Sequence, residues 1–351
     1  MTMSRDYRIG LVIPLRGPGG IYGPSCEAVA KLAAATLNDN GGILAREVQI
    51  EVIDASLPGP ALQEEITQLL ARDRIHAVTG WHISTVREQL APILTHRIPY
   101  VYTSLYEGGE SRPGVICSGE TPALQIAPAL RWLQENTGTQ RWAVVGANYV
   151  WPRRTVPVIR QYCHDLDLEI VDEIFVNYGT TDYSRALPRI ERSGAEGIIM
   201  LLVGRDAVAF NRAFSRQGLH HRILRFSPLM EENMLLASGS EATENLYVAA
   251  SYFQSLVSAS AQDFMSDYVH RFGPSAPPLN NAAESCYEGV ATLGALATAA
   301  ASTDVDEMAL HRGSVSYDGP RGFVHARDGL MHQDVHIAVA DGYEFDVVAT
   351  L

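Results

Sequence analysis

The segment WAVVGANYVWPRR (residues 142–154) decides the fold class. Its first five residues are apolar, as in a buried strand, and Gly-Ala-Asn ends the run. Pro152 then suits the first turn of a helix. Such strand–loop–helix units build α/β proteins, in which ligands bind beyond the carboxyl ends of the strands. Tyr149 and Trp151 occupy that loop, which leaves three roles open: a catalytic loop, a phosphate-binding loop, or one wall of a ligand pocket.

The same alternation runs along most of the chain. Other short apolar segments are typical of strands: Arg8–Pro14, Val48–Asp54, His76–Gly80, Tyr100–Thr103, Glu169–Val176, Gly197–Val203 and Ile223–Ser227. Stretches with helical periodicity separate them, so we expect parallel sheets with helices on both faces. We also expect a helical region over residues 263–301. Period-two strands with turns at Asp328-Gly329 and Asp341-Gly342 predict a hairpin-like tail.

Length, charge and cysteine usage limit the class of protein. The 351 residues suggest about two domains of roughly 150 residues each. A net charge of −13 disfavours direct binding to nucleic acid. We see no secretory leader and no apolar run of roughly 18 residues, so we expect no membrane span and a cytoplasmic protein. It would be periplasmic or lipid-anchored if a leader has been removed. The cysteines form no CxxC pair and are expected to be reduced, buried thiols: Cys26, Cys117, Cys163 and Cys286.

Several sequence features resemble parts of nucleotide-binding or catalytic sites but lack the other residues that such sites need. The glycine-rich stretch of residues 14–25 has neither a GxGxxG pattern nor a Walker Lys-Ser/Thr pair, which disfavours a nucleotide site. Ser84 is not in a GxSxG elbow, so it either caps a helix or faces a cleft. Glu107 has no second carboxylate at a recognisable spacing and is expected to be solvated. We therefore expect no catalytic residue and no cofactor.

The histidine pairs also give no convincing metal site. His220 and His221 are adjacent, which makes joint ligation awkward. His332 and His336 are four residues apart, but in a strand-like stretch this spacing does not bring side chains together. We therefore predict no metal.

Four segments carry a resemblance over nearly the whole chain. They are residues 106–133 (YEGGESRPGVICSGETPALQIAPALRWL), 146–154 (GANYVWPRR), 201–218 (LLVGRDAVAFNRAFSRQG) and 317–342 (YDGPRGFVHARDGLMHQDVHIAVADG). The chain resembles the type I periplasmic-binding-protein fold. Within it, the chain is most similar to the amide-sensing negative regulators of aliphatic amidase operons, which are related to urea and short-chain-amide binding proteins of ABC transporters.

The resemblance implies two Rossmann-like lobes that clamp a ligand between them. Three crossovers would lie near Gly119, Ser251 and Arg327. Lobe 1 would comprise residues 1–119 plus 252–326, and lobe 2 residues 120–251 plus 327–351. The implied ligand-binding residues are Ser84, Tyr102, Ser104, Tyr149 and Trp151, with His82, Leu105, Val203, Gly204, Arg205 and Met230. Ser84 would bind an amide through its hydroxyl and backbone N–H, and the aromatic side chains would close over the apolar part.

Some of these positions depart from the amide regulators. His82 and Trp151 replace tyrosines, Ser104 replaces threonine, and Met230 lies near an expected threonine. Arg205 is larger and more charged than the resemblance implies, and an arginine at this strand end is either solvated or points at an anionic group of the ligand. The departures leave the ligand open between an amide, an anionic compound and a bulkier molecule.

The leading hypothesis is a non-enzymatic ligand sensor that works by cleft closure. In the regulators that the chain resembles, the sensor holds a small RNA-binding antiterminator protein inactive until ligand binds. A homodimer is a further expected partner. The alternative is the substrate-binding component of an ABC transporter for amides, urea or branched-chain amino acids. An enzyme on the same fold lacks a set of catalytic residues.

Overall fold

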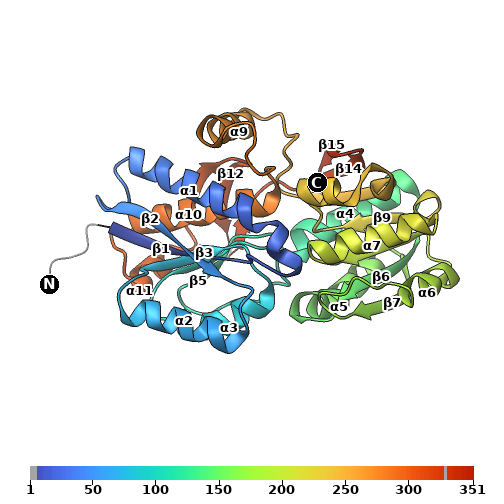
Figure 1. The fold of residues 1–351 in the computed structure, drawn as a ribbon, viewed down its shortest axis with the longest axis horizontal. Coiled ribbons are helices and arrows are strands. Elements are labelled where there is room, and N and C mark those ends of the chain that lie inside the picture. The colour runs from blue at the N-terminus through green and yellow to red at the C-terminus, as the bar shows by residue number, and fades with distance from the viewer. Residues whose placement is uncertain (1–5, 328–329) are drawn as a thin grey trace.

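The first lobe is built on an all-parallel sheet of five strands. The computed structural model describes residues 6–327 and 330–351, and its two lobes lie side by side (Figure 1). The first sheet has the order β2-β1-β3-β4-β5: β1 (Asp6–Ile13), β2 (Glu47–Asp54), β3 (Ala77–Gly80), β4 (Tyr100–Tyr102) and β5 (Val115–Cys117). On one face lie α1 (Gly23–Asp39) and α10 (Asn281–Ala300), and on the other α2 (Gly59–Ala71) and α3 (Ser84–Leu94). This lobe also contains η1 (Pro18–Ile21), α9 (Ala259–Phe272) and α11 (Val305–Leu310).

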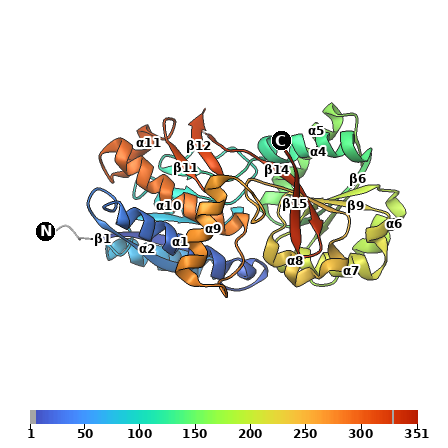
Figure 2. The same cartoon turned by 90° about the horizontal axis from the view of Figure 1, so that it is seen from above.

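The second lobe is built on a sheet of seven strands, in the order β15-β14-β10-β9-β8-β6-β7. Its parallel strands are β6 (Arg141–Ala147), β7 (Glu169–Val176), β8 (Gly197–Leu201), β9 (Leu224–Ser227) and β10 (Leu246–Ala250). The antiparallel hairpin of β14 (His336–Asp341) and β15 (Glu344–Thr350) extends it. Figure 2 shows α4 (Pro122–Thr137) and α5 (Val150–Asp165) on one face, with α7 (Arg205–Arg216) and α8 (Glu232–Ser238) on the other. Shorter elements are α6 (Ala186–Ser193), η2 (Leu219–His221) and η3 (Ser240–Thr243).

These sheets confirm the predicted fold class, α/β with two lobes and mostly parallel sheets. The reason is visible in β8, where every residue of GIIML is buried. A strand that is apolar on both faces is stable only when helices cover both faces. The predicted strand segments all fall on observed strands, with ends that differ by at most a few residues.

The predicted helical region over residues 263–301 is mostly helical, but residues 273–280 divide it into two helices, α9 and α10. Gly273 ends α9 with a φ of 78°, a left-handed value that favours glycine. Three prolines then follow before α10 begins, and proline cannot donate a helical hydrogen bond: Pro274, Pro277 and Pro278.

The chain passes between the two large sheets after β5, after β10 and before β14. A third, antiparallel sheet of β11 (Ser316–Gly319), β12 (Gly322–Arg327) and β13 (Leu330–His332) precedes the last passage. Because β13 pairs with β12, we place that passage after His332 rather than near Arg327. The lobe limits drawn from the resemblance stay a proposal. The predicted Asp328-Gly329 turn lies outside the described residues, whereas Asp341-Gly342 does connect β14 to β15.

A buried charge cluster lies where the chain passes between the lobes. The Arg321 guanidinium contacts Glu288, lies 3.3 Å from a carboxylate oxygen of Glu284 and 3.6 Å from one of Glu120. All four side chains are at most 1% exposed. Glu120 also accepts the backbone N–H of Ser251, at the second passage. One arginine thus connects two of the passages with α10.

Two expectations about the whole chain can be compared with the described residues. The four cysteines are free and buried, which confirms that prediction. In the part of the chain that the structure describes, no helix is both long enough and apolar enough to cross a membrane.

Candidate functional site

A small cavity lies between the lobes, with about 210 Å³ of space among its lining atoms, part of it open to solvent. The centre of a water-sized molecule can reach only about 10 Å³ of this space, so in this conformation the cavity leaves room for only a very small ligand. Its lining residues follow the carboxyl ends of five parallel strands, β3, β4, β6, β8 and β9, where α/β proteins bind their ligands. They are Trp81, His82, Ile83, Ser84, Tyr102, Ser104, Leu105, Tyr149, Trp151, Val203 and Leu229.

Most of the predicted site residues meet around this cavity: His82, Ser84, Tyr102, Ser104, Leu105, Tyr149, Trp151 and Val203. Sequence reasoning missed Trp81, Ile83 and Leu229. Trp81 follows β3 directly, and Leu229 lies two residues after β9, so their places beyond strand ends were the signal that could have found them. That these residues bind a ligand stays a prediction.

Three predicted residues do not line the cavity. Arg205 is exposed, and its guanidinium donates to the carbonyl oxygen of Gly17 at 3.1 and 3.3 Å. Met230 is buried, and the Asn211 amide donates to its sulfur at 3.7 Å. The backbone N–H of Gly204 donates to the Tyr22 hydroxyl at 2.9 Å. Arg205 therefore offers no positive charge to a ligand in the cavity and instead joins the two lobes.

His82 contributes its backbone rather than a charge. Its Nδ1 lies 2.9 Å from the carbonyl oxygen of Val12, so this nitrogen carries the proton, and Nε2 accepts from the Tyr100 hydroxyl at 2.6 Å. Burial lowers the pKa of His82 to about 3, so the ring is neutral at pH 7. The His82 carbonyl oxygen accepts from the hydroxyls of Tyr102 and Ser104, both at 2.8 Å. These bonds fix the lobe 1 wall of the cavity.

Ser84 does not cap α3, so that interpretation is wrong. It is the first residue of the helix, and its hydroxyl donates to a carboxylate oxygen of Glu107 at 2.7 Å. Glu107 is not solvated as expected, because its side chain is only 3% exposed and accepts from Arg87 at 2.7 Å. Since the Ser84 proton is engaged, its oxygen lone pairs remain for a donor group of a ligand.

On the lobe 2 side, Trp151 carries a hydrogen-bond donor, whereas Ser84 on the lobe 1 side is left as an acceptor. The residue is 2% exposed, and its indole Nε1 has no hydrogen-bond partner among the described residues. Indole N–H is only a donor, and a buried donor without an acceptor costs free energy. Tyr149 contacts the same ring, with 6.3 Å between the ring centroids. Trp151 also lines the cavity, so a carbonyl oxygen bound beside its Nε1 would supply the missing acceptor.

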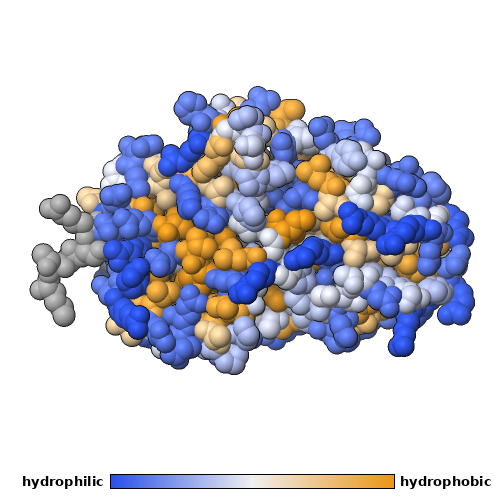
Figure 3. Space-filling model, viewed as in Figure 1, coloured by the Kyte–Doolittle hydropathy of each residue, from blue (hydrophilic) through white to orange (hydrophobic). Residues whose placement is uncertain are grey.

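The structure is a closed form, because several polar contacts join the lobes beside the cavity. Asn233 donates to the carbonyl oxygen of Ile21 at 2.8 Å, on the same side as the Arg205–Gly17 contact. On α5, Arg154 reaches Glu88 of α3 at 2.6 Å. On the face drawn in Figure 3 the surface is continuous from one lobe to the other, and its apolar residues gather over the first lobe.

Gly204 lies against the backbone of the opposite lobe, and closure requires it to be glycine. Its φ is 50°, and a Cβ atom would overlap the carbonyl oxygen of Pro18 in the opposite lobe. We expect Gly204→Ala to weaken ligand binding at least 10-fold, about 1.4 kcal/mol, because the substituted chain cannot close fully. Calorimetric titration measures this loss. Gly218→Ala is the matched control, since its φ is 66° but its Cβ would meet nothing within 4 Å. Equal affinities in the two variants would contradict the clash.

The electrostatics of the lining favour an uncharged ligand. None of the residues that line the cavity is Asp, Glu, Lys or Arg, and His82 is neutral. An isolated charge taken from water into such a site costs several kcal/mol unless it is paired. The site therefore suits a small molecule with one carbonyl acceptor, one N–H or O–H donor and an apolar part.

Solved structures with the same fold are similar to this chain over almost its full length. One is the solute-binding protein of an ABC transporter from Rhodopseudomonas palustris HaA2 in complex with p-hydroxybenzoic acid, with 18% identity and a TM-score of 0.88, covering 99% of this chain and 97% of that one. Another is a leucine-binding protein from Thermotoga maritima, with 16% identity, a TM-score of 0.87 and 98% of each chain covered. A third is an ABC transporter substrate-binding protein from Sphaerobacter thermophilus, with 22% identity, a TM-score of 0.83, and 99% and 98% covered.

At these identities the likeness shows the fold alone, and these relatives are binding proteins rather than enzymes. The family match shows more than the fold, because it covers both lobes. Residues 6–344 match the family described as periplasmic binding protein. With its two lobes, its three passages and its cavity between strand ends, the chain belongs to the periplasmic binding protein family.

Proposed function

We propose that the chain binds a small uncharged carbonyl compound, such as a short amide, between its lobes and serves as the substrate-binding component of an ABC transporter. The single observation that carries the ligand class is that the N–H of Trp151, a lining residue, has no partner among the described residues, while no charged side chain lines the cavity. The transport role is supported by the similar structures, which are solute-binding proteins of ABC transporters. It would place the protein outside the cytoplasmic membrane.

Amide geometry matches the polar groups that the two lobes present. The amide oxygen would accept from Trp151 Nε1, and the amide N–H would donate to the Ser84 oxygen, whose own proton is held by Glu107. The alkyl part would contact the aromatic rings of Tyr149 and Tyr102. An anionic ligand has less support, because Arg205 bonds Gly17 instead of lining the cavity.

An amide sensor is the second candidate, favoured by the small cavity formed by Ser84, Tyr102, Tyr149 and Trp151. This role requires an RNA-binding antiterminator partner, and both that partner and the homodimer stay predictions. The neighbouring genes separate the two roles, since permease genes indicate transport and an antiterminator gene indicates sensing.

A thermal-shift screen tests the ligand class. Binding to the folded state raises stability by RT ln(1 + [L]/Kd), about 2.7 kcal/mol at a ligand concentration 100 times Kd. We expect short amides or urea to raise the melting temperature, and acetate, benzoate and leucine to leave it unchanged. A rise with carboxylates or amino acids alone would overturn the proposed ligand class.

A further inference from the structure

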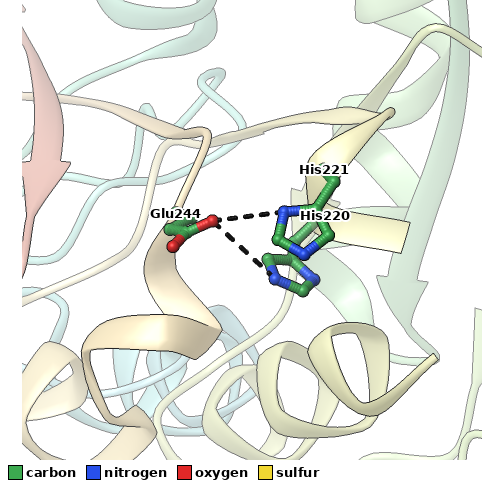
Figure 4. Close-up of side chains that lie close together, drawn as sticks. All are labelled: His220, His221 and Glu244. Atoms are coloured by element: carbon green, nitrogen blue, oxygen red, sulfur yellow. Dashed lines mark ion pairs between the residues drawn. The ribbon is translucent and has the colours of Figure 1, made fainter. Parts of the chain in front are cut away.

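A second cluster of polar side chains lies at the other edge of the second lobe. The cavity between the lobes is at the carboxyl ends of the strands, whereas η2 and the segment after η3 precede the amino ends of β9 and β10. His220 and His221 belong to η2, and Glu244 follows η3. Figure 4 shows the three side chains converging, with one Glu244 oxygen facing both imidazole rings. This cluster is therefore separate from the ligand cavity.

From this geometry we infer that His220, His221 and Glu244 form a binding site for a divalent transition metal such as Zn²⁺. One ligand atom from each residue lies within 4.8 Å of the other two. The Glu244 oxygen is 3.4 Å from His221 Nδ1 and 3.8 Å from His220 Nε2. Ligand atoms around a tetrahedral zinc, bonded at 2.0–2.1 Å, lie about 3.3 Å apart. Both distances from the Glu244 oxygen are within about 0.5 Å of that spacing.

The unpartnered ring nitrogens of buried His220 are an independent sign that an ion binds between these three side chains. The residue is 1% exposed, yet neither of its ring nitrogens has a hydrogen-bond partner among the described residues. Buried polar atoms are normally paired, and a neutral imidazole nitrogen without a partner carries a lone pair suited to a metal. Two histidines and one carboxylate are a ligand set that zinc accepts, with water in the fourth position.

Hydrogen bonds that do not involve these three side chains hold the two segments together. The side-chain amide of Asn245 donates to the carbonyl oxygen of His220 at 3.4 Å, and the Arg225 backbone N–H donates to the carbonyl oxygen of Asn245 at 3.0 Å. The β9–β10 pairing begins at Leu246 and Arg225. η2 places both rings beside Glu244, but their centroids are only 3.8 Å apart, so the two rings must separate for both nitrogens to bind one ion.

Calorimetric titration of the untagged, full-length protein with ZnCl₂ tests this site. We expect one equivalent to bind, and His221→Ala and Glu244→Gln to raise the Zn²⁺ dissociation constant at least 10-fold, because each removes a ligand. Both side chains are more than half exposed, so these variants keep the fold, which their thermal unfolding verifies. With CoCl₂, the visible absorption of bound Co²⁺ should be lost in the same two variants.

Two substitutions at exposed residues away from the cluster serve as matched controls. His164→Ala removes a histidine from α5, and Glu135→Gln removes a carboxylate from α4. Both are expected to bind Zn²⁺ like the wild type. The inference is overturned if the wild type binds no stoichiometric metal, or if His221→Ala and Glu244→Gln bind it as tightly as the controls do. Neither result bears on the ligand cavity.

Discussion

Replacing Arg321 by methionine is expected to lower the free energy of unfolding by about 3–5 kcal/mol, the usual cost of leaving a buried charge without its partner. The variant roughly keeps the side-chain volume but removes the cation that lies beside the carboxylates of Glu120, Glu284 and Glu288. Urea denaturation of the ligand-free protein measures the loss. Arg131→Met, at an exposed position on α4, is the control and should change stability by less than about 0.5 kcal/mol.

The same variant is expected to be more sensitive to alkaline pH than the wild type. Burial raises the pKa of Glu284, and the positive charge of Arg321 opposes that rise. Without the arginine this pKa rises further, so the folded state holds a proton that the unfolded state releases above a pH of about 4.3. Stability then falls as pH rises, and the deficit of the variant is larger at pH 8 than at pH 5.

A double variant shows whether charge is the cause of this loss. Adding Glu288→Gln to Arg321→Met removes one of the unpaired carboxylates, so part of the lost stability should return. If the free energy of unfolding of Arg321→Met is within about 1 kcal/mol of the wild-type value at both pH values, charge in this cluster does not stabilise the passages between the lobes.

Substitution of Trp151 is expected to produce the largest loss of ligand binding. Trp151→Ala removes an aromatic wall and the free N–H together, and buried aromatic contacts of this kind are worth about 2–4 kcal/mol, or roughly 30- to 1,000-fold in Kd. Trp151→Phe keeps the ring and loses only the donor, so we expect about a 10-fold increase in Kd. Calorimetry with a short amide measures both values.

The control for these variants is Trp132→Phe. Trp132 is half-buried on α4, where its ring packs on Tyr247 at 6.0 Å, and it does not line the cavity. Its substitution should leave Kd unchanged. If Trp151→Ala also binds like the wild type, the ligand does not occupy the cavity described above.

The fold was predictable because its main signals are local. Strands buried on both faces appear as short apolar runs, and helical periodicity separates them. Three features of the fold had weaker signals in the sequence. β5 has only three residues, β11 is the polar sequence SYDG, and the break between α9 and α10 depends on a glycine and three prolines within an otherwise helical region.

The candidate site was predictable only where position along a strand was enough. Tyr149, Trp151 and Tyr102 lie at strand ends, and strand ends meet at one edge of a parallel sheet. Arg205 lies at a strand end too, but its partner is a carbonyl oxygen of the other lobe, 188 residues away in the chain. Likewise, the burial of Glu107 depends on Arg87 from a neighbouring helix. Such contacts form only when distant segments of the chain pack together, and no local sequence pattern predicts them.

The most direct test of the central claim is calorimetric titration of the wild-type protein with propionamide and, separately, with propionate. The two molecules have nearly the same shape and differ in charge and in the amide N–H. A cavity with a free Trp151 N–H, an accepting Ser84 oxygen and no charged lining predicts saturable 1:1 binding of propionamide and none of propionate at the same concentrations. Binding of propionate as tight as that of propionamide, or tighter, would contradict it.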